Sequence, residues 1–104
     1  MKIALDYDGT YTADEEMWRK IIYFMACKYE VFVVTSRHEA DPIEDAGWFE
    51  AHRIPIIYCD YMAKKEVCDN LGIKIDIWID NDPYWINHSW PNVEAEKWRA
   101  TRES

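Results

Sequence analysis

Four short apolar runs, separated by longer segments with helical patterns, constrain the fold of this chain more than any other feature. The runs lie at residues 3–5, 31–34, 54–58 and 75–79. The first is too short for a helix, and the second is mostly β-branched, as is typical of a strand buried on both faces. Helices are expected at residues 12–29, 41–52 and 62–71. Strands that alternate with helices predict one α/β domain over residues 1–104, with a doubly wound parallel sheet between two layers of helices.

The expected helix starts follow from capping residues. Thr12 and Glu15 have the spacing of a capping box at the start of the first helix. In the second helix, Asp41 is the expected N-cap, with Pro42 at the first helical position and Glu44 three residues after the cap. Apolar side chains that recur every four residues predict the core-facing side of the first helix. They are Met17, Ile21, Met25 and Tyr29, with Trp18 and Ile22 beside them.

The last third of the chain has a weaker pattern. Gly72 is expected to end the third helix, because glycine favours the left-handed conformation that follows many helices. Residues 83–87 are a candidate short helix. Residues 93–102 are expected to form a last helix or to include a short strand.

Composition narrows the class of protein. A content of 49% hydrophobic and 15% aromatic residues is enough to fill a core, which argues against disorder. The net charge of -8 disfavours tight, non-specific binding to a polyanion, although a phosphate ester held through a metal remains compatible with it. No apolar run is long enough to span a membrane, and the first residues do not resemble a signal peptide. Cys27, Cys59 and Cys68 lack ligand-like spacing, so we expect buried free thiols, no zinc site and a cytoplasmic location.

Acidic and hydroxyl side chains follow three of the expected strands. Asp6, Thr35 and Asp80 each stand at a carboxyl end, which is where parallel α/β sheets bind ligands. Asp6 and Asp8 would share a face of an extended strand, and two such carboxylates repel unless a cation or a shared proton lies between them. The pair therefore suits a divalent metal and phosphate chemistry, with one acid as nucleophile and the other as proton carrier. The alternative is a strand end with two solvated aspartates.

The sequence DYDGT at residues 6–10 resembles the DxDGT signature of the haloacid dehalogenase superfamily of phosphotransferases. Candidates for the family's other three motifs follow in the family's order. They are the apolar strand that ends in Thr35 and Ser36, then Lys64 on an expected helix, and last the strand that ends in acids at residues 80–82. The resemblance covers residues 1–86 and implies the strand order 4-1-2-3.

The resemblance also implies a reaction, the Mg²⁺-dependent hydrolysis of phosphate monoesters. Asp6 would attack phosphorus and become a phospho-aspartate, while Asp8 would protonate the leaving oxygen and later deprotonate the attacking water. Asp6, the backbone carbonyl of Asp8, and Asp80 would hold the Mg²⁺ ion. Thr35 would donate a hydrogen bond to a phosphoryl oxygen, and Lys64 would place a positive charge beside the phosphate.

Lys65 is an alternative to Lys64 for the motif lysine. Lys64 lies on the same helix side as Cys68 and Leu71, so it leans toward the packed face. Lys65 precedes Asp69 by four residues, which suits an exposed ion pair. We therefore prefer Lys64.

The chain departs from the family pattern at two places. The fourth motif has Asn81 between Asp80 and Asp82, where related sequences have adjacent acids, and the second acid is either Asp82 or Asp76. Between the motifs there is room only for single helices and strands, so no cap domain is expected and the site should be open to water. Ser36 is the alternative to Thr35, because a slip of one residue would exchange the side chain that faces the site.

The segments at residues 35–37, 48–55 and 79–83 are similar to the capless branch of nucleotidases and polynucleotide 3′-phosphatases. In that branch an arginine after the second motif contacts the substrate, and Arg37 is the matching residue. Small phosphate esters or mononucleotides are the expected substrates, with nucleic-acid ends as the alternative. A non-catalytic binding domain is a second alternative, since six tryptophans offer apolar anchors and a small domain of this kind is a candidate for a homodimer.

Overall fold

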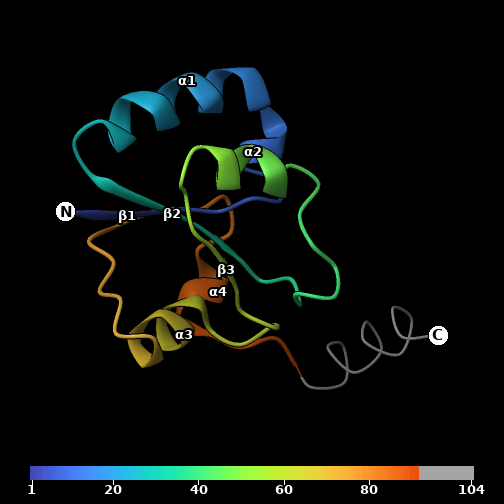
Figure 1. The fold of residues 1–104 in the computed structure, drawn as a ribbon. Helices are drawn as coiled ribbons and strands as arrows, with labels where there is room; N and C mark the ends of the chain where they lie inside the picture. Colours follow the sequence, from blue (N-terminus) through green and yellow to red (C-terminus); the bar gives the residue numbers. More distant parts are fainter. Residues whose placement is uncertain (92–104) are drawn as a thin grey trace.

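The computed structural model describes residues 1–91, which form a sheet of four parallel strands between layers of helices. The strands are β1 (Lys2–Leu5), β2 (Glu30–Thr35), β3 (Ile56–Tyr58) and β4 (Ile77–Ile79). Their spatial order is β3-β2-β1-β4, and every neighbouring pair is parallel (Figure 1). Read from the other edge, this order is the predicted 4-1-2-3, so the predicted fold class is confirmed.

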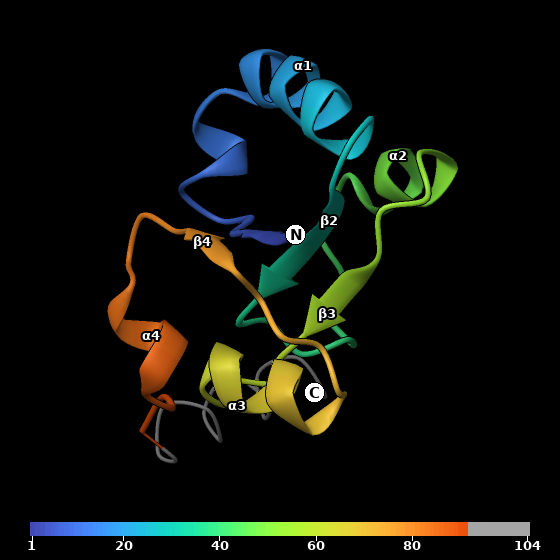
Figure 2. The same cartoon turned by 90° about the vertical axis from the view of Figure 1, so that its left-hand side faces the viewer.

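Helices cover both faces of the sheet. They are α1 (Glu15–Ala26), α2 (Ala46–Ala51), α3 (Lys64–Asn70) and α4 (Tyr84–Asn87), with a 3-10 turn (Tyr11–Ala13) before α1. Both views place α1 and α2 on one face of the sheet and α3 on the other, with α4 beside α3 (Figures 1 and 2). Single helices connect the strands, so residues 1–91 contain no cap domain. The candidate helix at residues 83–87 is confirmed as α4, whereas the one at residues 93–102 lies outside the described residues.

The sheet separates two apolar cores, because successive side chains on a strand point to opposite faces. The first core lies under α1 and α2 and contains Leu5, Tyr7, Tyr11, Ile22, Val31, Val33, Ile43, Phe49 and Ile54. The second core lies against α3 and contains Ala4, Phe32, Val34, Ile57, Cys59 and Cys68. In the first core the ring of Tyr11 lies 5.3 Å from that of Tyr7 and 5.0 Å from that of Phe49, measured between centroids. These aromatic contacts anchor the segment that follows β1 and carries the acidic motif.

The predicted capping box at the start of α1 is wrong. The helix begins at Glu15, and the carboxylate of Asp14 accepts a hydrogen bond from the Met17 backbone nitrogen. The hydroxyl of Thr12 instead accepts a hydrogen bond of 2.9 Å from the backbone nitrogen of Gly9. Thr12 therefore holds the turn after β1 rather than the helix.

The predicted core-facing side of α1 is confirmed at Trp18, Ile22 and Met25 and is wrong at Met17. Ile22 is buried, and Trp18 and Met25 pack against the first core beside it. Met17, which the pattern placed inside, is 41% exposed. The spacing of Trp18, Ile22 and Met25 keeps the predicted helical period, and the core-facing side does not extend to Met17.

The second helix starts at Ala46 rather than at Asp41. The backbone before it makes bonds elsewhere, since the carbonyl of Pro42 accepts from Arg37 at 3.1 Å and the nitrogen of Ile43 donates to the Tyr58 hydroxyl at 3.2 Å. These tertiary bonds replace the helical bonds that the capping residues favour locally.

Two strands and one helix are shorter than predicted. Strands β3 and β4 each begin two residues later than expected, and α3 covers Lys64–Asn70. Gly72 has a φ of +74° just after α3, as predicted for the residue that ends this helix. All three cysteines are free; Cys59 and Cys68 are buried as expected, whereas Cys27 is exposed.

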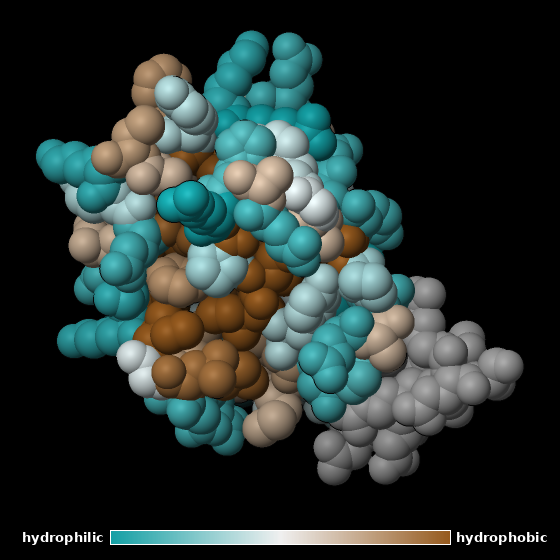
Figure 3. Space-filling view, in the orientation of Figure 1, coloured by the Kyte–Doolittle hydropathy of each residue, from teal (hydrophilic) through white to brown (hydrophobic). Residues whose placement is uncertain are grey.

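Among residues 1–91, no helix has the length and apolar character needed to cross a bilayer. A band of hydrophobic residues crosses the middle of the face in Figure 3, between the helical layers. The band marks where the apolar layers around the sheet reach the surface on this side.

Candidate active site

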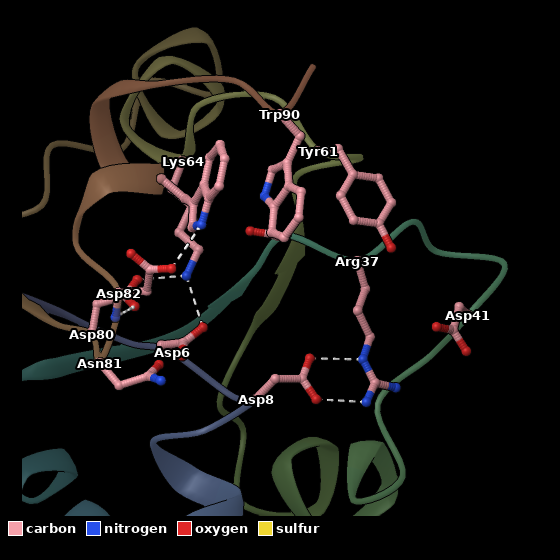
Figure 4. A pocket seen from close by; sticks show the side chains of 12 residues that line it. Asp6, Asp8, Arg37, Asp41, Tyr61, Lys64, Asp80, Asn81, Asp82 and Trp90 are labelled. Carbon is pink, nitrogen blue, oxygen red and sulfur yellow. Dashed lines mark hydrogen bonds and ion pairs between the residues drawn. The ribbon is translucent and has the colours of Figure 1, made fainter. Parts of the chain in front are cut away.

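A pocket of about 370 Å³ opens at the carboxyl edge of the sheet. Asp6 reaches it from the end of β1 and Asp80 from the end of β4, while Arg37 comes from the loop after β2 and Lys64 from the first turn of α3. Asp8 also lines it. The parallel topology thus brings together most of the site residues that the sequence predicts (Figure 4).

The buried end of the pocket is an ion-pair network around Lys64. Its ammonium nitrogen lies 2.7 Å from Asp6 Oδ1 and 2.6 Å from Asp80 Oδ2. The exposed fractions of the three side chains are 3% for Lys64, 8% for Asp6 and 4% for Asp80. Lys65, the alternative motif lysine, pairs with Asp69 at 2.8 Å on the surface.

Burial and the neighbouring charges shift the pKa values of this network in opposite directions. Burial raises the pKa of the Asp6 carboxyl, and the nearby Lys64 offsets only part of that increase. For Lys64, desolvation is the largest single effect and lowers the pKa, but Asp6 and Asp80 together outweigh it and raise the pKa above its ordinary value. Lys64 therefore stays protonated near neutral pH and balances charge between two buried carboxylates.

The exposed rim of the pocket is formed by Asp8 and Arg37. Arg37 donates from Nε to Asp8 Oδ2 at 2.9 Å and from Nη2 to Asp8 Oδ1 at 2.7 Å, a bidentate pair. Its Nη1 donates to the carbonyl of Pro42 and to Glu44 at 3.3 Å, and the guanidinium lies over the ring of Tyr7. The hydrogen bond with Asp8 raises the pKa of Arg37. Both oxygens of the Asp8 carboxylate are thus engaged, although the side chain is 53% exposed.

Thr35 and Ser36 are placed differently from each other. Thr35 is 1% exposed, and its hydroxyl accepts a hydrogen bond from the Arg37 backbone nitrogen at 3.2 Å. Ser36 lines the pocket, and Thr35 is not among the lining residues. The alternation along β2 explains this, because Val33 lies in the first core and Val34 in the second. By the same alternation, Ser36 shares the face of Asp6.

Asn81 occupies a position that the sequence analysis did not assign to the site. One end of its amide lies 2.8 Å from Asp6 Oδ2, 3.1 Å from the carbonyl oxygen of Asp8 and 3.2 Å from the Thr10 hydroxyl. Its backbone nitrogen also donates to the Thr10 hydroxyl at 3.0 Å. Gly9 has a φ of +84°, and a Cβ there would lie 2.4 Å from the Asn81 amide. The departure from adjacent acids at residues 80–82 was the one signal that pointed to this residue.

An aromatic wall faces the acids across the pocket. The rings of Trp85 and Trp90 are stacked, with centroids 4.2 Å apart and an angle of 13° between planes. The ring of Tyr61 meets Trp90 edge-on at 5.6 Å, and Trp85 Nε1 donates to Asp82 at 2.9 Å. Nothing in the spacing of Trp85 and Trp90 along the sequence indicated that they would lie at the pocket.

Oxygen atoms suited to a hard divalent cation converge beside Asp6. Within residues 1–91, no three His, Cys, Asp or Glu side chains are grouped to hold a metal ion. The Asp8 carboxylate is held by Arg37, and Lys64 lies between Asp6 and Asp80. Asp6 Oδ2, which accepts a hydrogen bond from the Thr10 hydroxyl at 3.2 Å, and the Asp8 carbonyl nevertheless lie together beside the Asn81 amide, and oxygens of this kind are the ligands that Mg²⁺ prefers. Because Gly9 has no Cβ, the Asn81 amide has room beside these oxygens.

Comparisons of the chain with known protein families, with curated proteins and with solved structures give no match. The fold and the pocket define an α/β domain with a buried acid–lysine network at the carboxyl edge of a parallel sheet. The resemblance to the haloacid dehalogenase superfamily rests on the motif residues and on their order along the chain.

Proposed function

We propose that the protein is a Mg²⁺-dependent phosphatase that hydrolyses phosphate monoesters through a phospho-aspartate at Asp6. One observation carries the proposal. Asp6 ends a central strand, is fixed by Lys64 at 2.7 Å, and opens into a pocket that also contains Asp8. A carboxylate is a poor nucleophile for a negatively charged phosphate, so a neighbouring ammonium that is held in place lowers the electrostatic barrier.

The chemistry balances with the residues in the pocket. A carboxylate oxygen of Asp6 forms a bond to phosphorus as the ester bond breaks, and Asp8 donates a proton to the leaving oxygen. Asp8 then takes a proton from the water that cleaves the phospho-aspartate, which releases phosphate and restores Asp6. Lys64 offsets charge at Asp6 throughout. Asp6, the Asp8 carbonyl and a residue of the segment 80–82 would hold a Mg²⁺ ion, which would supply positive charge to the phosphoryl oxygens.

Arg37 and Asp8 must separate before this reaction starts. Both carboxylate oxygens of Asp8 accept hydrogen bonds from Arg37, which leaves neither in position to exchange a proton with substrate. A substrate phosphate is a competing bidentate partner for the guanidinium. Substrate binding at Arg37 would therefore release Asp8 for acid–base catalysis. Ser36 is the hydroxyl that lines the pocket beside them, while Thr35 holds the Arg37 backbone.

A mononucleotide or a similar small ester fits the surroundings better than a polymer. The aromatic wall of Tyr61, Trp85 and Trp90 offers stacking surface for a base at the rim. The net charge of -8 disfavours the many phosphate contacts that a nucleic acid needs. Nucleic-acid ends remain the alternative substrate. A cytoplasmic location and a homodimer stay predictions.

A panel of phosphate esters, assayed with Mg²⁺ and with chelator, tests the proposal. We expect metal-dependent phosphate release that Asp6→Asn abolishes and that Asp69→Asn, a matched change at a surface ion pair, leaves unchanged. Intact-protein mass spectrometry of quenched reactions should detect a phosphorylated chain. Stripped wild-type protein that is inactive on every ester after Mg²⁺ is restored would favour the non-catalytic binding domain.

Salt dependence separates the two classes of substrate. If an oligonucleotide 3′-phosphate makes several phosphate contacts, its log affinity falls steeply with log salt, by about one unit of slope per contact. We expect a shallow slope and no advantage over a mononucleotide. Much tighter oligonucleotide binding with a steep slope would show that nucleic-acid ends are the substrate.

A further inference from the structure

We infer that the protein forms a weak dimer with a second copy of itself, in which the outer sides of the two α1 helices pack antiparallel to each other. The sequence leaves a homodimer open without indicating a surface for it. The outer side of α1 consists of the exposed residues Met17, Lys20, Tyr23 and Phe24, together with Cys27 at the C-cap. This dimer does not depend on the proposed function, because no residue of α1 lines the pocket at the carboxyl edge of the sheet.

Apolar side chains gather on the outer side of α1. Phe24 is 75% exposed, Tyr23 is exposed beside it, and their rings meet edge-on with centroids 6.0 Å apart. Met17 is exposed two helical turns earlier. Both views show α1 as the outermost layer on its side of the sheet, and no other element of residues 1–91 covers these side chains (Figures 1 and 2). One exposed apolar residue is normal, whereas a group of them on one helix indicates a contact surface.

The spacing of the outer residues is that of a seam between two helices. Met17, Lys20, Phe24 and Cys27 follow one another at intervals of three, four and three residues. This is the pattern of positions a and d in a coiled coil, where two helices pack along a narrow stripe. The stripe lies on the side of α1 opposite Ile22, which is buried in the first core. The helix can therefore pack on the core and on a partner helix at the same time.

The charges of α1 favour the antiparallel orientation. Glu15 and Glu16 lie in its first turn, and Lys28 directly follows its C-cap. In an antiparallel pair, the acidic start of each helix lies at the level of Lys28 in the other, whereas a parallel pair would bring acids to the level of acids. The dipoles of the two helices add to the same preference. A second copy of this chain is thus complementary to the surface in charge as well as in spacing.

A two-fold axis beside the middle of α1 satisfies the seam in both copies. Met17 then lies against Cys27 of the partner subunit, and Lys20 lies against Phe24 of the partner subunit. The aliphatic stem of Lys20 covers the aromatic ring while its ammonium stays in water. Within one chain, Lys20 pairs with Glu16 at 3.6 Å, but both side chains are exposed and the pair contributes little that dimerisation would have to replace.

Sedimentation equilibrium measures the association. A contact of about three helical turns is small for a specific interface, so the apparent mass should rise from one chain toward two only at high protein concentration. Phe24→Glu should weaken association by at least about 100-fold, because it removes an apolar anchor from both copies and adds two charges to the seam. Leu71→Glu is the matched control, since Leu71 is 60% exposed at the C-cap of α3, on the other face of the sheet. This control should associate like the wild type.

Disulfide cross-linking tests the register of the two helices. Under mild oxidation, Met17→Cys should join to the native Cys27 of the partner subunit and give a covalent dimer. Within one chain the two positions are ten residues apart along the helix, about 15 Å, which is too far for a disulfide. Wild-type protein, whose other two cysteines are buried, should give no covalent dimer. The double variant Met17→Cys with Cys27→Ser should give none either.

The outcomes decide between this dimer and other uses of the surface. Association that Phe24→Glu weakens and Leu71→Glu retains, with a cross-link in Met17→Cys alone, supports the dimer. A wild type that is still monomeric at about 1 mM overturns it, and so does equal weakening in the two glutamate variants. A cross-link in the double variant would show a parallel pair and overturn the antiparallel one. If vesicles of anionic lipid bind monomeric wild type but not Phe24→Glu, the surface is a membrane contact and the dimer is overturned.

Discussion

Asp6 and Asp8 lie two residues apart in the sequence, yet the two ends of the pocket that they define have opposite surroundings. The buried end, formed by Asp6, Lys64 and Asp80, has no side chain more than 8% exposed. At the exposed rim, the Asp8 side chain is 53% exposed and pairs with Arg37. The end of β1 at Leu5 accounts for the difference, because the chain turns from Tyr7 on and Asp8 no longer follows the strand direction of Asp6.

Asp6 is held by a fixed partner, whereas Asp8 has a partner that can be exchanged. Buried carboxylates are stable only while a charged partner compensates for their lost hydration, so Lys64 and Asp6 have little freedom to part. A pair near solvent is weakened by screening, and its partners can be exchanged. Two acids in different environments are suited to different tasks. A fixed nucleophile and a mobile proton carrier are the tasks that these two environments suit.

Replacement of Asp6, the fixed acid, should have the largest effect on turnover. Asp6→Asn keeps the shape of the side chain but cannot attack phosphorus, so turnover should fall by at least about 10⁴-fold. Far-ultraviolet circular dichroism should show an intact fold. Measurable turnover with wild-type pH dependence would remove Asp6 from the nucleophile role.

Replacement of the buried Lys64 should have the largest effect on the free energy of unfolding. Lys64→Met leaves Asp6 and Asp80 as unpaired buried charges, so the free energy of unfolding should fall by about 3–5 kcal/mol. Urea unfolding measures it, with Lys65→Met as the control, because that exposed pair contributes about 1 kcal/mol or less. Equal effects in the two variants would show that the network around Lys64 is not a buried one in solution.

Asp8→Asn tests the proton carrier at the rim. It removes general acid and base catalysis but keeps the nucleophile, so turnover should fall by about 10²–10⁴-fold. The loss should be greatest for esters with poor leaving groups, which need protonation most. A series of esters with different leaving-group pKa values measures the dependence. A loss below about tenfold for the poorest leaving group would argue that another group is the acid.

The fold was predictable because its signals are local and repeated. Each buried strand is a short apolar run, and alternation with helices leaves few topologies for a parallel sheet. The boundaries were harder to predict. The start of α2 moved from Asp41 to Ala46 because Arg37 and Tyr58 bond to the backbone in between, and these partners come from other parts of the chain.

The site was predictable where it depends on strand ends and not where it depends on loops. Asp6 and Asp80 were predicted to lie together because both follow strands of a parallel sheet, whereas Lys64 was predicted from the motif order and its side of the helix. The pair of Asp8 with Arg37, and the position of Asn81, depend on the paths of irregular segments that no periodicity describes. The aromatic wall likewise depends on how the segment after β4 folds back over the loop before α3. There the backbone nitrogen of Trp90 donates to the backbone carbonyl of Tyr61 at 2.7 Å.

Replacement of Arg37 tests whether the rim of the pocket binds the substrate phosphate. Arg37→Ala should raise KM by about 10–100-fold by removal of a bidentate phosphate ligand, and Arg37→Lys should restore little because an ammonium lacks the fork geometry. Stability should change by about 1 kcal/mol or less, since the pair is partly exposed. Steady-state kinetics and urea unfolding measure the two effects. An unchanged KM for every ester would show that Arg37 serves only to hold Asp8.

The smallest expected effect is a change of stability with pH. Burial raises the pKa of Asp6 above its ordinary value of 3.8, so its protonated form favours the folded state, and that contribution is lost as pH rises through the folded-state pKa. Asp6→Asn lacks this titration. Its stability relative to the wild type should therefore increase as pH rises above the ordinary pKa of Asp6, and it should level off above the raised folded-state pKa.

Lys64 does not contribute to that change, because its raised pKa lies above this range and the group is protonated throughout. The other carboxyl groups are present in both proteins, so to first order their titration cancels in the difference. Urea unfolding of the wild type and of Asp6→Asn at several pH values measures the difference between their free energies of unfolding. If the wild type instead gained stability relative to Asp6→Asn as pH rose, the pair with Lys64 would outweigh burial. Asp6 would then be a stabilising partner of the lysine rather than an acid held at a cost to stability.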